Sequence, residues 1–420
     1  MLGKPRFSYD LHTNMVKVKK EKILIKPGDI APSSSKLKVM GAFNPGAIRL
    51  PNGEIVLYAR ILEKLITTED ENYFYSPRMI GKKSFKLKIE RFRKDTIKHG
   101  SDLDFIFKDG TKRLTFICHL RKVVLDKSGF NIKSIEQKPS FYGLAWDGEL
   151  GVEDPRIVQI GKLYVMTYVS LSRTENISTS YAISNDCKYW YRRGLIFGEQ
   201  NKDVVLFPEI INEKYVAFER PEGSFQFTPP HIWISYSKDL EFWGDKKPFT
   251  LSKKGDWDSG RVGAGPPPIK TEKGWLFIYH GILNYKNKIK INEIIKRMEI
   301  SDSISGTIKP TDVIYCVGAV LLDLKNPRKV IAKTKIPILF PMKKHEIGTF
   351  EDKRVVFPTG LVLDESKKYI LLYSGAGDFI TTIKKISLDK IFKKLGVWDF
   401  SQHIFSTPSN QHHKPLQNYH

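Results

Sequence analysis

The chain has 420 residues, of which 41% are hydrophobic and 12% aromatic, a composition that fits a globular, β-rich protein with a large core. The net charge of +23 would attract anionic partners such as phosphate, anionic sugars or nucleic acid, but a lysine-rich, solvated surface accounts for it more simply. Cys118, Cys187 and Cys316 lack CxxC spacing, and no stretch approaches the ~20 apolar residues of a membrane helix, so we expect no zinc site, disulfide framework or membrane span.

In chain order, the N-terminal part predicts an entry segment followed by a pair of strands. Residues 1–40 show no apolar core of a secretory signal, so we expect a protein of the reducing cytoplasm. Residues 43–61 predict two strands joined by the turn Pro51-Asn52-Gly53. Residues 82–135 alternate apolar and polar side chains around Lys108-Asp109-Gly110, which predicts an extra β-hairpin rather than a helix.

The rest of the chain predicts mostly strands. Residues 151–282 hold two complete periods of a repeat and the opening of the next, and residues 314–342 return to strands. Between them, residues 288–300 carry isoleucines and a methionine at helical spacing, which predicts a short amphipathic helix. The tail, residues 401–420, is polar, and we interpret its His412-His413 pair as part of a solvated end rather than a metal site.

One pattern recurs five times: a proline opens an apolar run, a turn follows, and a β-rich run ends in aromatic or polar residues. The copies are Phe43-Asn44-Pro45 to Arg60, Glu153-Asp154-Pro155 to Tyr168, Leu206-Phe207-Pro208 to Arg220, Gly265-Pro266-Pro267-Pro268 to His280, and Val356-Phe357-Pro358 to Gly375. A strand–turn–strand unit cannot bury its apolar face alone, whereas copies stacked around an axis can. The repeat therefore predicts an all-β fold, a five-bladed β-propeller.

The spacing of the copies supports this fold. Pro155 and Pro208 lie 53 residues apart, and the pattern Ser-x-Asp-x-x-x-Trp at 184–190 recurs at 237–243 with the same period. Two intervals are too long for one blade and predict insertions at about 64–135 and 284–312, after the first repeat and before the last. We expect one catalytic domain over 1–400.

In a propeller, residues at one phase of several repeats converge on a central channel. The polar residues at that phase are Asn44, Arg60, Asp154, Lys202, Asp203, Arg220, Arg261, His280 and Asp378. The set holds few carboxylates and several cations. We therefore predict one shared anion-binding pocket.

Asp154 is the candidate catalytic residue, because Pro155 fixes the backbone beside it. A single carboxylic acid can protonate a leaving oxygen of a sugar. Inverting hydrolysis needs a second carboxylate to activate water, whereas phosphate is already an anionic nucleophile and needs only cations to hold it. One acid beside several cations favours phosphorolysis. The alternative is that Asp154 caps a turn and the cations pair with surface acids.

The sequence resembles glycoside hydrolase family 130, the β-mannoside phosphorylases. The strings that carry the resemblance run in order from about 43 to 380: Asn44-Pro45-Gly46, Gly151-Val152-Glu153-Asp154-Pro155-Arg156, Lys202-Asp203-x-x-Leu206-Phe207-Pro208-Glu209, Arg220-Pro221, Gly263-x-Gly265-Pro266-Pro267-Pro268-Ile269, Gly274-Trp275-Leu276 with Tyr279-His280-Gly281, and Tyr315-x-x-Gly318-Ala319-x-Leu321-Leu322-Asp323. An ordered series of short strings is far more specific than any one of them.

The resemblance implies a five-bladed propeller and inverting phosphorolysis of a β-mannoside to α-mannose 1-phosphate. Asp154 matches the general acid of the family, which acts through a sugar hydroxyl. The resemblance assigns phosphate binding to Lys202, Arg220, Arg261, His280 and Tyr315. It assigns the sugar to Asn44, Arg60, Asp203 and Asp378. It implies no metal or organic cofactor, only inorganic phosphate as co-substrate.

The chain departs from the family pattern at a few positions. Glu219 precedes Arg220 where many members have His, Gly377 stands before Asp378 where Ala is usual, and Lys202 and Arg261 exchange the two basic residue types. A carboxylate at 219 could repel phosphate or act as a base, but strand alternation points it away from the Arg220 side.

Two other functions stay open: a β-mannosidase on the same scaffold, with Glu219 or another acid as base, and a non-catalytic propeller that binds glycans or nucleic acid through its basic insertions. The sequence leaves the leaving sugar, the linkage (β-1,2 or β-1,4) and a homo-oligomeric state undetermined. Small-molecule oligosaccharide and phosphate are the expected partners, and nucleic acid is not favoured.

Overall fold

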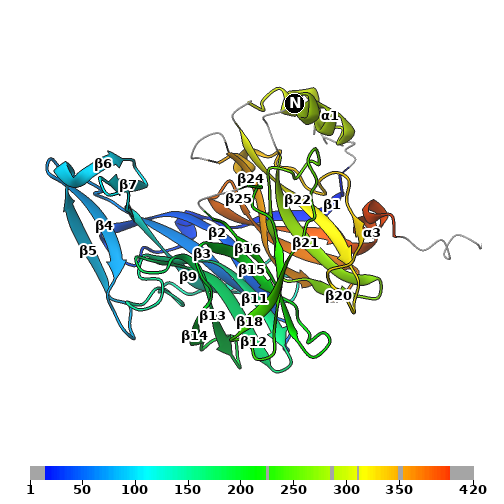
Figure 1. Ribbon diagram of the computed structural model, residues 1–420, viewed down its shortest axis with the longest axis horizontal. Helices are drawn as coiled ribbons and strands as arrows, with labels where there is room; N and C mark the ends of the chain where they lie inside the picture. The colour runs from blue at the N-terminus through cyan, green and yellow to red at the C-terminus, as the bar shows by residue number, and fades with distance from the viewer. Residues whose placement is uncertain (1–14, 224–226, 284–287, 310–311, 349–352, 398–420) are drawn as a thin grey trace, which may run out of the picture.

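The structure is a computed structural model that describes residues 15–223, 227–283, 288–309, 312–348 and 353–397, without the side chains of 288–291. The described residues form an all-β protein with a few short helices (Figure 1). The strands make three separate four-stranded antiparallel sheets, a nine-stranded sheet and two small sheets, and none of these sheets closes on itself. The predicted tail lies outside the described residues.

The three four-stranded sheets follow one another along the chain. The first consists of β2 (Leu37–Arg49), β3 (Ile55–Leu65), β9 (Phe116–Leu125) and β10 (Ile132–Ile135). The second consists of β11 (Gly151–Ile160), β12 (Leu163–Ser172), β13 (Asn176–Ser184) and β14 (Tyr191–Phe197). The third consists of β15 (Asn201–Leu206), β16 (Tyr215–Pro221), β17 (Trp233–Ser237) and β18 (Trp243–Pro248).

The nine-stranded sheet is made of two antiparallel groups. The fourth group of the chain consists of β19 (Arg261–Ala264), β20 (Ile269–Thr271), β21 (Gly274–Leu283), β22 (Val313–Leu322) and β23 (Val330–Lys333). The fifth consists of β24 (Lys353–Leu363), β25 (Tyr369–Ala376), β26 (Ile380–Ser387) and β1 (Val18–Ile25). A short parallel pairing of β22 with β24 joins them. Each of the five sequence repeats begins in or just after the first strand of one group.

The first inserted region is shorter than the sequence indicated. It forms two small sheets that project from one end of the molecule (Figure 1). Their strands are β4 (Tyr73–Met79), β5 (Leu87–Arg93), β6 (Ile97–Gly100), β7 (Asp104–Phe107) and β8 (Lys112–Leu114). β9 and β10 also lie within the predicted insertion, but β9 pairs with β3 along its whole length and so completes the first sheet. A period-2 pattern predicts strands but not their partners, which explains the misplaced boundary.

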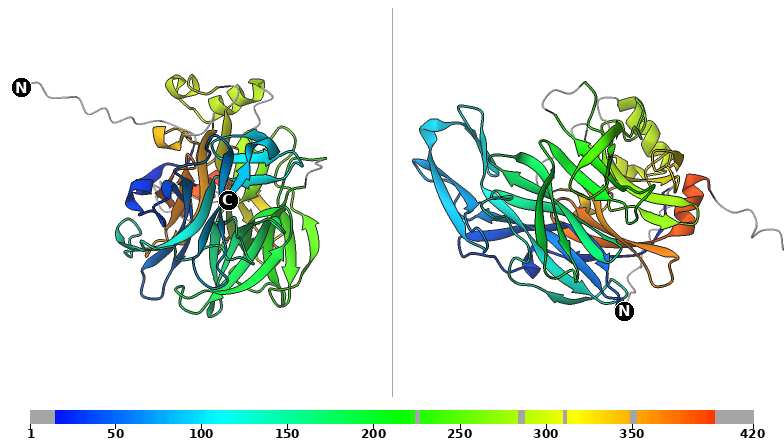
Figure 2. Two further views of the ribbon diagram at one scale, coloured as in Figure 1. Left: turned by 90° about the vertical axis from the view of Figure 1, so that its left-hand side faces the viewer. Right: turned by 60° about the horizontal axis from the view of Figure 1, so that its bottom comes forward.

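The helices are few and short. They are α1 (Lys288–Arg297), α2 (Asp302–Ser305), α3 (Leu388–Leu395), and the 3₁₀ turns η1 (Pro27–Asp29), η2 (Lys94–Thr96) and η3 (Lys344–Glu346). The helix predicted over 288–300 is confirmed by α1 (Figure 2). No helix of the described residues is long and apolar enough to cross a membrane.

Aromatic side chains fill the space between neighbouring sheets. Phe207 and Phe218 of the third sheet pack edge-on, with ring centroids 5.2 Å apart, and Phe218 lies 4.8 Å from Phe277 of the fourth group. Edge-to-face and offset contacts of this kind are the favourable geometry for aromatic rings. This packing fixes the sheets against one another and with them the ends of their first strands.

The first strands of three sheets carry the same local irregularity. The pairing register shifts at Asn44 in β2, at Asp154 in β11 and at Asp203 in β15. All three residues have a left-handed backbone, with φ of 46°, 48° and 55°. Proline follows Asn44 and Asp154 and cannot donate to the ladder, so the strand bulges there. The bulge re-aims a polar side chain of each strand, and left-handed non-glycine residues of this kind gather at functional sites.

Candidate active site

One cavity of about 290 Å³ collects nearly all the predicted site residues. Asn44, Arg60, Asp154, Lys202, Asp203, Arg220, Arg261, Tyr315 and Asp378 all line it, together with Phe43, Leu62, Leu103, Phe116, Gly348, Lys353, Val355, Phe357 and Gly377. These residues come from every sheet group of the molecule. Five of the lining side chains are cationic and three are carboxylic, so the wall is predominantly basic.

Asp154 is held by two donors from the first sheet. Its Oδ1 accepts hydrogen bonds from Nδ2 of Asn44 (2.9 Å) and from Arg60 (3.1 Å). Arg60 also donates to Oε1 of Glu153 (2.6 Å) and lies over the ring of Phe43. Because Arg60 is fixed on several sides, it keeps the carboxylate of Asp154 in one orientation.

Two of the three carboxyl groups of the cavity, those of Asp154 and Asp378, differ in the direction of their pKa shifts. Burial disfavours the ionised form of Asp154, but the charges of Arg60 and Arg156 outweigh it, so the pKa of Asp154 lies below its ordinary value. Burial, with Asp154 nearby, instead raises the pKa of Asp378, and Lys353 only partly offsets this. In the ligand-free protein Asp154 is therefore ionised at neutral pH.

Arg220 is locked by a buried ion pair. Its guanidinium lies 2.5 Å from Oδ2 of Asp203, and both side chains are nearly inaccessible. Arg156 approaches the other oxygen of Asp203 at 3.5 Å and also donates to the backbone carbonyl oxygens of Asp154 and Gly265. Burial opposes ionisation of Asp203, but Arg220 and Arg156 outweigh it and lower the pKa of this carboxyl. Asp203 therefore holds two cations in place at the wall of the cavity.

His280 differs from its predicted position. It is fully buried and does not line the cavity; its Nε2 accepts a hydrogen bond from Arg220 (3.2 Å). Burial, reinforced by Arg220, lowers the pKa of His280 to about 3 despite the nearby Asp203. His280 is therefore neutral and supports Arg220 from behind. Tyr315 does line the cavity, and burial raises its pKa, so it presents a neutral hydroxyl.

Arg261 is tied to Arg220 through a carboxylate that the sequence analysis missed. Glu222 accepts from Arg261 at 2.7 Å and from Arg220 at 3.3 Å. Glu222 follows the last residue of β16, so strand alternation gave no signal for it. The roles of Arg156 and Lys353 were also missed, as was the apolar part of the lining, although Phe43 and Phe357 stand in two of the repeats.

Glu219 points away from the cavity, as strand alternation predicted. It is fully buried, and Oε2 accepts from Asn201 at 2.6 Å. Ser235 and Lys246 contact the same carboxylate. Glu219 is therefore neither beside the anion site nor placed to activate a water molecule there.

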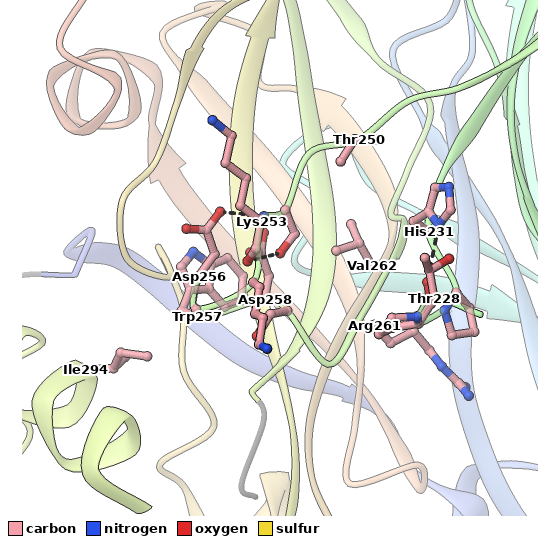
Figure 3. A pocket seen from close by; sticks show the side chains of 16 residues that line it. Thr228, His231, Thr250, Lys253, Asp256, Trp257, Asp258, Arg261, Val262 and Ile294 are labelled. Carbon is pink, nitrogen blue, oxygen red and sulfur yellow. Dashed lines mark hydrogen bonds between the residues drawn. The ribbon is translucent and has the colours of Figure 1, made fainter. Parts of the chain in front are cut away.

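A second, larger cavity of about 630 Å³ shares Arg261 with the first (Figure 3). Its wall is formed mainly by the segments before β17 and before β19, and Ile294 of α1 closes one side. Its acidic residues Asp256 and Asp258 are both engaged by Lys333. Apart from Arg261, it contains no predicted site residue, so the smaller cavity is the candidate active site.

The fold and this cavity define an all-β protein with a predominantly basic cavity at the meeting point of its five strand groups. A profile described as beta-1,4-mannooligosaccharide phosphorylase, that of glycoside hydrolase family 130, matches residues 107–396. The chain belongs to this family.

Named relatives cover most of the chain. It is 32% identical over 90% of its length to a beta-1,2-mannobiose phosphorylase of Listeria innocua, of which 97% is covered. It is 34% identical over 64% of its length to a 1,2-beta-oligomannan phosphorylase of Thermoanaerobacter, of which 78% is covered. The solved structure of the Listeria innocua enzyme with beta-1,2-mannobiose superposes with a TM-score of 0.73 over 89% of this chain and 97% of that one, at 31% identity.

Proposed function

We propose that the protein is an inverting phosphorylase that cleaves a β-mannoside with inorganic phosphate and releases α-mannose 1-phosphate and a shortened sugar. The observation that carries this proposal is one acid, Asp154, in the same cavity as Lys202, Arg220 and Arg261. Membership of a family described as a mannoside phosphorylase supports the choice of sugar.

The arrangement of the five strand groups supports a five-bladed propeller within one domain. β2 contacts both β11 and β24, β11 contacts β15, and β15 contacts β19. β22 of the fourth group pairs with β24 of the fifth, which brings the series back to β2. In this arrangement the first strands surround the cavity, which accounts for the contribution of every group to its lining.

In the proposed reaction, an oxygen of phosphate attacks the anomeric carbon of the mannosyl unit while the bond to the leaving oxygen breaks. Arg220 and Arg261 balance the charge of phosphate. The leaving oxygen takes a proton that originates at Asp154 and passes through a sugar hydroxyl.

Arg60 and Arg156 hold the pKa of Asp154 below its ordinary value. Phosphate bound in the same cavity would bring a like charge near this carboxyl, and a like charge raises the pKa of a carboxyl. Phosphate binding would therefore favour the protonated form of Asp154, which is the form that donates the proton.

Hydrolysis is less well supported. A water-activating base has to be ionised and free. Asp203 is paired with Arg220, and the pKa of Asp378 is raised by burial. Glu219 is buried outside the cavity lining.

We propose a β-1,2 linkage for the substrate. The relative that covers nearly the whole chain is named a beta-1,2-mannobiose phosphorylase, whereas the relative named beta-1,4-mannooligosaccharide phosphorylase is 29% identical over 57% of the chain. Inorganic phosphate is the only co-substrate proposed. The cytoplasm is the proposed location, because all three cysteines are free and buried.

The test is an assay of the purified protein with β-1,2-mannobiose or β-1,4-mannobiose, with and without phosphate. We expect mannose 1-phosphate from the β-1,2 substrate only when phosphate is present. Release of free mannose alone, at a rate that phosphate does not change, would overturn phosphorolysis. A preference for β-1,4-mannobiose would overturn the linkage only.

A further inference from the structure

The cavity has an apolar wall that the proposed chemistry does not use. Leu62 of β3, Phe116 of β9 and Leu103 line it on the side of the first sheet. Leu103 lies between β6 and β7, so it is contributed by the inserted region. The cations Lys202, Arg220 and Arg261 come from the third sheet and the fourth group.

The two walls lie on opposite sides of the proposed ring of strand groups. β2 contacts β11 and β24, so in the proposed ring the neighbours of the first sheet are the second sheet and the fifth group. The third sheet and the fourth group then lie across the ring. Figure 1 likewise shows β4–β7 at one end of the molecule and β21 and β22 toward the other.

The inverting stereochemistry of the proposed reaction indicates which reactant each wall contacts. The nucleophile and the leaving group occupy opposite faces of the anomeric carbon in an inverting displacement. If phosphate rests on the cations, the leaving sugar has to face the first sheet. On that side Asn44 and Arg60 are hydrogen-bonded to Asp154. The remaining lining there, Leu62, Leu103 and Phe116, presents carbon atoms, which suit the apolar face of a sugar ring.

We propose that Leu103, supplied by the inserted region, packs against the leaving sugar together with Leu62 and Phe116 and so contributes to the affinity for that sugar. This inference rests on the proposed phosphorolysis. A contact of this kind removes carbon atoms of the sugar ring from water and needs no hydrogen bond to its hydroxyl groups.

Leu103 is held in place by contacts at the base of the insertion. Its carbonyl oxygen accepts from the backbone N–H of Thr115 (3.0 Å), and the Thr115 hydroxyl donates to the carbonyl oxygen of Asp102 (2.7 Å). Thr115 is fully buried, and the carboxylate of Asp102 forms an ion pair with Lys64 of β3. Leu103 therefore lies at the edge of the first sheet, although the residues next to it in the sequence belong to the insertion.

The experiment measures synthesis from α-mannose 1-phosphate with mannose as the acceptor sugar. In Leu103→Ala we expect the KM for the acceptor to rise about fivefold to tenfold, the effect of losing one or two methylene groups from a contact, with the KM for α-mannose 1-phosphate unchanged. Ile66→Ala, at an exposed position near the start of the insertion, is the matched control. Leu103→Met retains apolar contact and should restore the acceptor KM.

The outcomes separate this inference from the function. An unchanged acceptor KM in Leu103→Ala, in an active enzyme, overturns the assignment of the leaving-sugar wall. No phosphate release with mannose as acceptor, combined with no phosphorolysis of β-mannobioses, would overturn the proposed function instead.

Discussion

The two walls of the cavity are built in different ways. On the basic side, Arg220 is fixed by the buried carboxylate of Asp203, by His280 behind it and by Glu222, which also holds Arg261. On the apolar side, Leu103 lies on a connecting segment of an inserted region and is tethered through its backbone. The basic wall is a network of paired charges within the main sheets. Part of the apolar wall comes from a segment inserted at the edge of the first sheet.

The two walls should therefore differ in how well they tolerate substitution. A buried charge is costly unless it is paired, so replacing one charged residue of the basic wall leaves its partner as a buried, unpaired charge. An inserted connection tolerates substitution, because its backbone runs over the surface and few buried groups depend on it. In the proposed reaction the basic wall binds phosphate, which is always the same, and the apolar wall contacts the leaving sugar.

The largest expected effect comes from Asp154, the proposed acid. In Asp154→Asn, proton donation is lost, and we expect the rate of phosphorolysis to fall by about 10²- to 10⁴-fold. Initial rates of mannose 1-phosphate release measure this. Asp95→Asn, at an exposed position of the insertion, is the control, and a rate within about tenfold of wild type in Asp154→Asn would contradict the role of Asp154 as acid.

The next effect isolates the basic wall. Arg220→Met removes the partner of Asp203 and a donor to phosphate, and we expect the KM for phosphate to rise about 30-fold or more, as for other buried charge pairs. Arg220→Lys keeps the charge but not the planar fork, so its effect should be smaller. Arg93→Met, at an exposed ion pair, controls for loss of a positive charge. If Arg220→Met leaves the phosphate KM unchanged, the anion does not bind at this wall.

A glycine beside Arg220 offers a milder test of the same wall. A Cβ at Gly263 would lie 2.5 Å from Nη1 of Arg220 and 2.4 Å from Cε1 of His280, and neither group is free to move away. We expect Gly263→Ala to raise the phosphate KM about fivefold to tenfold, within the usual range for overpacking. Gly244→Ala, where a Cβ meets nothing within 4 Å, is the matched control. Equal kinetics in the two variants would show that the position of Arg220 is not limiting.

The last prediction concerns stability rather than rate. Because the pKa of His280 is lowered from 6.5 to about 3 in the folded protein, the unfolded chain takes up a proton over this range and the folded protein does not. Stability is therefore lost as pH falls from 6.5 toward 3, by up to about 1.4 kcal/mol per pH unit from this group.

Replacing His280 removes that contribution. In His280→Asn the slope of the free energy of unfolding against pH should decrease by about this amount, measured by urea denaturation between these two pH values. His99→Asn, on the exposed insertion, should keep the wild-type slope. An unchanged slope in His280→Asn would mean that the buried imidazole is protonated in the folded state.

Much of the site was predictable from the sequence, because several site residues occur near the start or the end of a repeat. Asn44 and Asp154 stand directly before the proline of their repeats, and Asp203 stands five residues before Pro208 of the third. The structure brings all three to one cavity through the bulges of their strands. The helix at 288–297 and the outward direction of Glu219 were also predictable, since both follow from local periodicity.

The sequence by itself determined which residues share a phase and which face of a strand each occupies, because these depend on the period of the chain alone. Only the tertiary structure decided that β9 pairs with β3, that Glu222 joins Arg220 to Arg261, that His280 is neutral behind Arg220, and that Leu103 reaches the cavity from an insertion. These are contacts between segments far apart in the sequence or consequences of burial. Partner choice, desolvation and the resulting charge states depend on how whole sheets pack.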